Sequence, residues 1–199
     1  MCPLFFLTGK AFMKIAFVLL AALLATGAVH AEAEFDVEAA AGQCAACHGA
    51  EGVPSDPAIP IIHGQEFFYL YTQLKDYAAE RRANDIMSPM AAQFERSQMK
   101  ALAQYFSEKS WPMIQTEAQE GDAQLAQRAM SRGQCSACHG EWQGDSRIPR
   151  AAGQQPGYLE QTMKDLKNEV RLNAAAKISV MKKVEDEEIE ALARYLGDL

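Results

Sequence analysis

The stretch GQCAACHG at residues 42–49 decides the fold, because the near-copy GQCSACHG follows 91 residues later at residues 133–140. The likeness continues along the chain. Further matches are IP at 59–60 and 148–149, GQ at 64–65 and 153–154, YL at 69–70 and 158–159, and ALAQY at 101–105 with ALARY at 191–195. A repeat of this length indicates a duplicated domain, because the units of a solenoid are much shorter.

Both stretches contain the motif Cys-x-x-Cys-His. This spacing lets two thiols form thioethers with the vinyl groups of haem while the adjoining histidine reaches the iron. The sequence therefore predicts two covalently bound haem c groups. The expected thioether residues are Cys44, Cys47, Cys135 and Cys138, and the expected proximal iron ligands are His48 and His139. The other ring nitrogen of each histidine needs an acceptor, for which the carbonyl groups around Pro60 and Pro149 are candidates.

Three other uses of these cysteines compete with haem. A zinc site would have to pool ligands from both Cys-x-x-Cys pairs, yet each pair lies in its own complete repeat and is followed at once by histidine. A thioredoxin-like redox pair belongs with a pattern of strands and helices that the sequence lacks. Structural disulfides leave both histidines without a role. Covalent haem accounts for the two cysteines and the histidine of each motif together.

Each unit is predicted to consist of helices, so the expected fold is all-α, with two tandem domains each wrapped around one haem. One helix is expected before and through the cysteine motif, one from residue 65 or 154 towards residue 84 or 173, and one at the end of the unit. The terminal helices carry apolar residues at i, i+3, i+4 and i+7, which predicts a buried stripe on each. The two stripes are Met99, Leu102, Ala103 and Phe106, and Ile189, Leu192, Ala193 and Leu196.

Two methionines, Met87 and Met90, lie between Arg82 and the first terminal helix, where a thioether would cover the open face of the haem. At this point the sequence resembles the diheme cytochrome c4 group of the class I cytochromes c. The resemblance rests on both Cys-x-x-Cys-His units, the IP, GQ and YL matches, the Arg-x-Asn segment and the last helix with its tyrosine. In that family the distal methionine stands 18 residues before this tyrosine, so the resemblance selects Met87, counted back from Tyr105.

The second unit departs from the family's pattern. Counting 18 residues back from Tyr195 reaches Lys177, and the only methionine nearby is Met181. A lysine must bind iron as the neutral amine, and lowering its reference pKa of ~10.4 to near 7 costs roughly 4 to 5 kcal/mol. Methionine has no such cost and needs only a shortened segment before the terminal helix. Met181 is therefore the expected distal ligand, with Lys177 or an open site as alternatives.

His63 is the one further histidine after the N-terminal segment. Its counterpart in the second repeat is Ala152, and it adjoins the Gly-Gln pair at residues 64–65. This setting favours a packing role at the surface or at the haem edge over ligation of iron.

The N-terminal segment has the pattern of a secretory signal peptide. Met13-Lys14 is a short basic region, residues 15–25 are apolar, and Val29-His30-Ala31 supplies small residues before a cleavage site after Ala31. The apolar run is shorter than the ~20 residues that a membrane span requires. We therefore expect a signal peptide at residues 1–31, with Met13 as an alternative start, a periplasmic location, and no membrane span in the mature chain.

The mature chain is expected to form two cytochrome c domains, at residues 32–115 and 116–199, joined through the Trp-Pro-containing segment 109–119. The whole sequence has a formal net charge of −7, and without residues 1–31 it has 17 basic and 26 acidic residues, a formal −9. Such a charge disfavours a nucleic-acid partner. It favours encounters with basic redox proteins.

The function implied by the resemblance is one-electron transfer. Iron with histidine and methionine ligands has no vacant position for a substrate and changes oxidation state without making or breaking bonds. We therefore expect a soluble periplasmic electron carrier and not an enzyme, with a membrane cytochrome complex, a terminal oxidase or reductase, or a dehydrogenase as donors and acceptors. The alternatives are a diheme subunit of a periplasmic dehydrogenase, similar to that of flavocytochrome sulfide dehydrogenases, and an enzyme with an open second haem.

Overall fold

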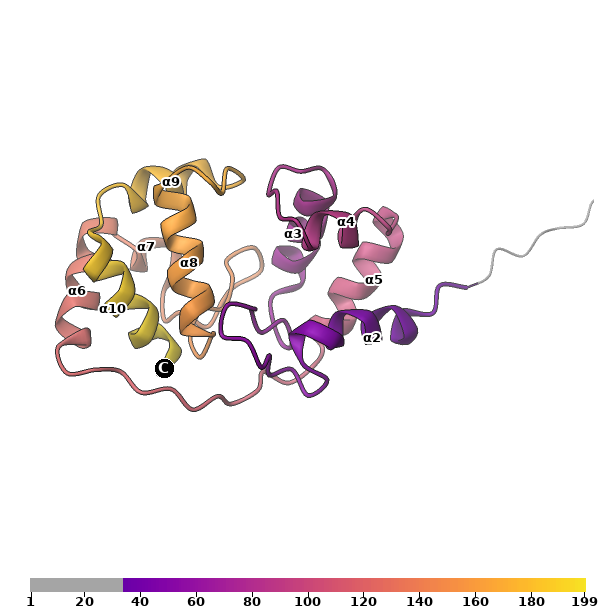
Figure 1. Cartoon of the computed structure of the whole chain (residues 1–199), viewed down its shortest axis with the longest axis horizontal. Coiled ribbons are helices and arrows are strands. Elements are labelled where there is room, and N and C mark those ends of the chain that lie inside the picture. Colours follow the sequence, from indigo (N-terminus) through magenta and orange to yellow (C-terminus); the bar gives the residue numbers. More distant parts are fainter. Residues whose placement is uncertain (1–33) are drawn as a thin grey trace, which may run out of the picture. The chain divides into compact units, whose positions relative to one another are not determined.

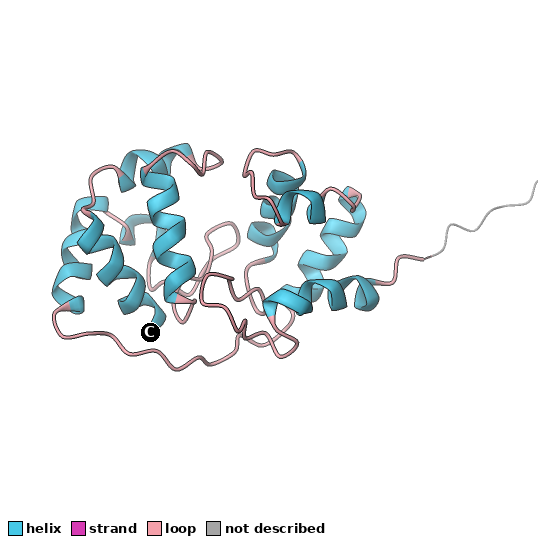
Figure 2. Ribbon diagram, viewed as in Figure 1, coloured by secondary structure: helices cyan, strands magenta, loops and turns pink. Residues whose placement is uncertain are grey.

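The computed structural model describes residues 34–199, and residues 35–199 form one compact unit. The expected signal peptide at residues 1–31 and the alternative start at Met13 lie outside the described residues. Within 34–199 the regular structure is entirely helical (Figure 2). An isolated bridge between Asp145 and Ile148 is the exception, and it forms no strand. The prediction of an all-α fold is confirmed.

The helices form two groups that follow the sequence repeat (Figure 1). The first group consists of α2 (Val37–His48), α3 (Phe67–Ala78), α4 (Met87–Ala91) and α5 (Arg96–Ser107). The second group consists of α6 (Asp122–Gly133), α7 (Ser136–His139), α8 (Pro156–Lys167), α9 (Ala175–Met181) and α10 (Asp186–Gly197).

The terminal helices α5 and α10 form the centre of each group. Helix α5 contacts α2 and α3, and α10 contacts α6 and α8. The predicted apolar stripes are confirmed as core, because every one of their eight residues is at most 5% exposed. Both helices begin with a reciprocal capping box, formed by Glu95 with Gln98 and by Glu185 with Glu188, which satisfies backbone N–H groups that helix ends otherwise leave unpaired.

The helix through the cysteine motif is continuous in the first group only. Helix α2 is capped by Asp36, whose carboxylate accepts a hydrogen bond of 2.9 Å from the Ala39 N–H, and it runs unbroken to His48. In the second group Gln134 has φ +48°, a left-handed conformation that ends α6 before the shorter α7 begins. The expectation of one helix through the motif is therefore wrong for the second unit.

The second predicted helix of each unit ends earlier than expected. Helices α3 and α8 stop near residues 78 and 167, where Glu80 and Glu169 adopt φ of +54° and +59° and reverse the chain. The Arg82 and Arg171 N–H groups then donate to carbonyls of the preceding helices at 3.1 and 3.0 Å. Both arginine side chains are buried. Their tertiary contacts, which local helix propensity does not register, determine where these helices end.

The glutamine of the repeated Gly-Gln pair joins the two helix groups. Gln65 accepts a hydrogen bond from the Arg150 N–H at 2.8 Å and donates to the Arg150 carbonyl at 3.0 Å. Gln154 makes the same two bonds with Ile61, at 2.8 and 3.0 Å. Residues 61 and 150 follow the two matching prolines, so the duplicated sequence forms a reciprocal pair of side-chain clamps. Both glutamines are at most 4% exposed.

Residues 108–121, which connect α5 to α6, contain no helix. The predicted boundary between domains 32–115 and 116–199 lies in this segment, and it stays a prediction because residues 35–199 form one compact unit. Across residues 34–199, every helix is too short or too polar to span a membrane.

Candidate haem sites

One cavity of about 810 Å³ is bordered by residues of both helix groups. Leu70, Leu102 and Phe106 contribute apolar walls from the first group, and Leu159 and Leu192 do so from the second. Every residue that the sequence singled out for haem lies on this lining: Cys44, Cys47, His48 and Met87 from the first unit, and Cys135, Cys138, His139, Lys177 and Met181 from the second.

The histidine expected to be the first proximal ligand is oriented by its expected acceptor. The Nδ1 atom of His48 lies 2.8 Å from the Pro60 carbonyl oxygen, which can only accept, so Nδ1 donates and Nε2 keeps its lone pair for a metal. Burial lowers the pKa of His48, while this hydrogen bond acts in the opposite direction. The prediction for the carbonyl of Pro60 is confirmed.

The histidine expected to be the second proximal ligand has a different environment. The buried Nδ1 atom of His139 has no hydrogen-bond partner within residues 34–199, so the predicted bond to a carbonyl around Pro149 is wrong in this structure. The imidazole instead stacks on Trp142, with ring centroids 5.0 Å apart and planes 20° apart. Burial, followed by the charge of Lys177, lowers the pKa of His139 to about 4. The neutral ring favoured here is the form that binds iron.

The first distal candidate sits at the start of a short helix. Met87 is the first residue of α4, and its N–H donates to the Asn84 side-chain oxygen at 2.8 Å. The same oxygen accepts from the Ile86 N–H at 3.0 Å, so Asn84 caps the segment and fixes where the methionine begins it. Met90 also lines the cavity, one turn later.

The second distal candidates share helix α9, one turn apart. Met181 is 7% exposed and packs in the core of the second group with Ile178 and Val184. Lys177 is half-buried, and its charge reaches His139 strongly enough to act on the pKa of that ring. Burial and the neighbouring charge of Arg171 lower the pKa of Lys177 to about 8.

The cavity wall also carries a polar cluster that the sequence analysis does not predict. Arg82 donates to the Tyr158 hydroxyl at 3.1 Å and to the Gln73 side-chain oxygen at 2.9 Å. Arg171 donates to the same Gln73 oxygen at 3.1 Å, and Asn173 donates to Asp76 at 2.7 Å. These bonds join the two helix groups. The repeated Arg-x-Asn segment was the available signal, because it occurs once in each unit with both arginines buried.

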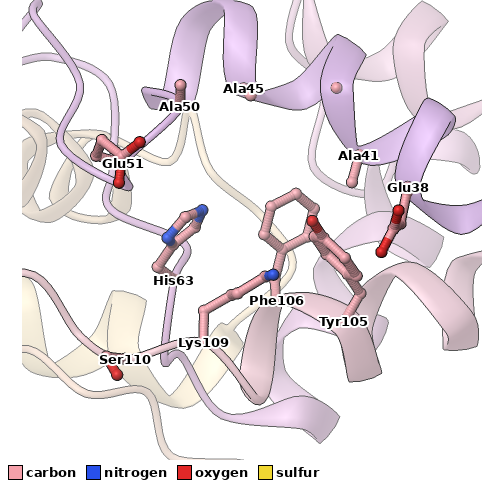
Figure 3. Close-up of a pocket in the computed structure, with 11 residues that line it drawn as sticks. Glu38, Ala41, Ala45, Ala50, Glu51, His63, Tyr105, Phe106, Lys109 and Ser110 are labelled. Carbon is pink, nitrogen blue, oxygen red and sulfur yellow. The ribbon is translucent and has the colours of Figure 1, made fainter.

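His63 lines a separate pocket of about 380 Å³ (Figure 3). Its ring packs against Phe106 with centroids 5.6 Å apart, and Lys109 and Glu51 flank it. Burial, then the charge of Lys109, lowers its pKa. Because His63 is absent from the larger cavity's lining, the structure agrees with the expected packing role.

The larger cavity fits covalent haem better than it fits the competing uses of the cysteines. All four thiols are free, and burial raises the pKa of Cys44 and Cys135. No group of three or more His, Cys, Asp or Glu side chains within residues 34–199 is placed to hold a metal ion, which removes the basis for a pooled zinc site. What remains is an apolar cavity with two thiol pairs and two imidazoles on its wall.

Comparison with known proteins gives the same assignment. Cytochrome c4 of Thiocapsa roseopersicina is 32% identical over 180 residues, which cover 79% of this chain and 88% of the relative. This chain belongs to the diheme cytochrome c4 family. The crystal structure of reduced recombinant cytochrome c4 from Pseudomonas stutzeri matches with a TM-score of 0.72 and 26% identity, over 82% of this chain and 98% of that chain.

Another relative is named for its redox role. The thiosulfate dehydrogenase electron acceptor of Stutzerimonas stutzeri is 31% identical over 173 residues, or 80% of each chain. No protein-family model matches the sequence. As a cytochrome c4, the chain is an electron-transfer protein with two tandem class I cytochrome c domains and two covalently bound haem c groups.

Proposed function

We propose that this cytochrome c4 is a periplasmic carrier that passes single electrons between respiratory proteins. The observation that supports this most strongly is the single cavity onto which both complete Cys-x-x-Cys-His motifs open. Cys44 and Cys47 would hold the first haem covalently, with His48 and Met87 as iron ligands. Cys135, Cys138 and His139 would hold the second, and its distal ligand is taken up below.

The haem groups supply the one-electron chemistry, because their iron alternates between ferric and ferrous states. The chain's own residues control the setting of that chemistry. The hydrogen bond from His48 to the Pro60 carbonyl fixes the ring orientation and raises the basicity of the ligating nitrogen. The leucine and phenylalanine walls keep water away, which favours the less charged reduced state. The two glutamine clamps hold both halves of the cavity together.

The periplasmic location and the signal peptide at residues 1–31 are part of the proposal. They are supported by the sequence pattern before Ala31 and by the membership of the cytochrome c4 family. The mature chain's formal −9 favours redox partners with a basic docking face, whose association rate falls as salt is added. With both haems closed by protein ligands, the molecule carries electrons and performs no bond chemistry of its own.

A second candidate function is that of a dedicated acceptor for, or haem subunit of, a periplasmic dehydrogenase. The relative named as a thiosulfate dehydrogenase electron acceptor supports it, since that protein covers 80% of this chain. Under this reading the electrons come from one enzyme bound to the carrier, and a flavocytochrome sulfide dehydrogenase is another enzyme of this kind.

The experiment that tests the proposal starts from the mature chain produced with haem-maturation machinery. We expect two haems per chain, reversible one-electron steps in a redox titration, and fast electron exchange with a basic cytochrome in stopped-flow measurements that slows with added salt. Fewer than two covalent haems contradicts the proposal. A stable stoichiometric complex with a dehydrogenase, purified from cells that make the chain, favours the second candidate function.

A further inference from the structure

The segments that carry the two distal candidates match hydrogen bond for hydrogen bond. Ala92 N donates to Ser88 O as Lys182 N donates to Ile178 O, and Phe94 N donates to Ala91 O as Val184 N donates to Met181 O. Each member of a pair is 90 residues from its counterpart. Helices α5 and α10, which follow, also begin 90 residues apart, at Arg96 and Asp186.

This register decides which residues are equivalent. No residue is gained or lost between the ligand segment and the terminal helix, so the shortened segment that a Met181 ligand requires is absent. At a separation of 90 residues Lys177 corresponds to Met87, and Met181 corresponds to Ala91. Ala91 is 0% exposed and Met181 is 7% exposed. Met181 therefore fills a core position that the first unit fills with alanine.

We propose that Lys177 is the distal ligand of the second haem iron, and that Met181 is a core residue. This inference rests on the proposed function, because it presupposes a haem held by Cys135, Cys138 and His139. The ligand is the neutral amine: the ammonium releases one proton to solvent, and the nitrogen lone pair forms the bond to iron. No electron is transferred in this step.

The surroundings of Lys177 support the assignment. Lys164, Lys167 and Lys182 each form an ion pair with a carboxylate at 3.0 Å or less. Lys177 forms none within residues 34–199, although it lines the cavity beside His139. Its charged neighbours include the buried Arg82 and Arg171, which oppose a second positive charge. A half-buried ammonium at an apolar cavity is disfavoured without a partner, and such charges pair or give way to metal coordination.

The test counts the long-wavelength band that ferric haem shows only with a methionine ligand. In the wild-type holoprotein we expect one equivalent of this band for two haems, from Met87. Lys177→Met should raise it to two equivalents and raise the lower of the two reduction potentials, because methionine ligation raises the potential. Met181→Leu should leave one equivalent. Lys183→Met is the matched control, since it places a methionine at an exposed lysine nearby and should also leave one.

Three results would overturn the proposal. Two equivalents in the wild type would make Met181 the ligand and leave Lys177 to pair with a haem carboxylate. Loss of half the band in Met181→Leu would do the same. Carbon monoxide binding to one haem of the reduced wild type would show an open site. A haem count below two per chain instead contradicts the proposed function, so the two failures are distinguishable.

Discussion

The segments Met87–Ala91 and Ala175–Met181 share the same backbone hydrogen-bond pattern. They differ in the side chain that lines the cavity, which is Met87 in the first and Lys177 in the second. Helix α4 begins with a methionine whose N–H donates to the Asn84 side chain, whereas α9 begins two residues before Lys177 and has Ala174 at the position of Asn84. Asn173, which follows Arg171 as Asn84 follows Arg82, bonds instead to Asp76 of the other helix group. Duplication preserved the scaffold, and under the proposed ligation a change of side chains gives its two halves different metal environments.

The two halves also differ in how much core they have without haem. The cluster of the second group contains twelve buried residues and that of the first contains six. We therefore expect the first domain to depend more on its cofactor. Cys44→Ser with Cys47→Ser should lower the melting temperature at least about 5 °C further than Cys135→Ser with Cys138→Ser does, since about 1 kcal/mol corresponds to ~4–8 °C in a domain of this size.

Thermal denaturation followed by circular dichroism measures this difference, with mass spectrometry to show that each double variant has kept one haem. Equal losses for the two double variants would mean that the clusters do not set the dependence on haem.

Exchanging the two distal side chains sharpens the comparison. In the double variant Met87→Lys with Lys177→Met, the methionine band should stay at one equivalent while the higher reduction potential moves from the first haem to the second. The reason is that methionine ligation raises the potential of whichever haem carries it. A redox titration assigned to each domain by nuclear magnetic resonance measures the order, and an unchanged order would show that the surroundings outweigh the ligand.

The ion pair between Asp122 and Arg194 has no counterpart in the first domain. Asp122 is 2% exposed and accepts two hydrogen bonds from Arg194, at 2.8 and 2.9 Å, whereas the first domain has Gln104 at the position of Arg194. Asp122→Ala should cost about 2–3 kcal/mol, because charged hydrogen bonds are strong and a half-buried guanidinium loses its partner. Gln104→Ala, the matched change in the first domain, should cost much less in urea unfolding.

The same pair gives a pH dependence with a definite sign. The hydrogen bond from Arg194 lowers the pKa of Asp122 from its ordinary 3.8. A lowered carboxyl pKa stabilises the folded state above the unfolded value, and the contribution is lost as the pH falls from about 4 through the folded pKa. The wild type should therefore lose more stability than Asp122→Asn between pH 5 and pH 3. Parallel curves for the two proteins would contradict this assignment.

The smallest expected effect concerns the glutamine clamps. Removing either side chain leaves a buried backbone N–H and carbonyl without partners, at about 1–2 kcal/mol. Gln154→Ala should cost more than Gln65→Ala, because Ile61 is 1% exposed while Arg150 is only half-buried. Gln161→Ala, whose side chain bonds at an exposed site, is the control. Chemical denaturation measures all three variants, and the reverse order would place the tighter contact at Gln65.

The duplicated motifs made the helical fold, the two haem c groups and the buried stripes predictable, because covalent spacing and helical periodicity are local properties of a sequence. The Pro60 carbonyl was also predictable as the acceptor for His48. The absence of that bond at His139 was not predictable, because both units carry the same motif and only the structure shows this ring stacked on Trp142. The clamps of Gln65 and Gln154 were not predictable either, because a repeated Gly-Gln pair does not reveal that each glutamine bonds to the other unit.

Counting residues along the sequence was not sufficient to choose the distal ligand of the second haem. Counting back from Tyr195 reached Lys177, but the cost of a neutral amine favoured Met181 as long as the segment length was undetermined. The matched hydrogen bonds from residues 88 to 94 and 178 to 184 supply that length. At that length Lys177 stands at the position of Met87, and Met181 stands at the position of the buried Ala91.

Near-infrared magnetic circular dichroism of the ferric wild-type holoprotein tests the difference between the two haems most directly, because an amine and a thioether ligand give separate ligand-dependent bands. If the two haems are ligated as proposed, the spectrum should contain two bands of equal weight. One band belongs to the haem with His48 and Met87, and the other to the haem with His139 and Lys177. A single thioether band of double weight would contradict the account, since both irons would then have methionine ligands.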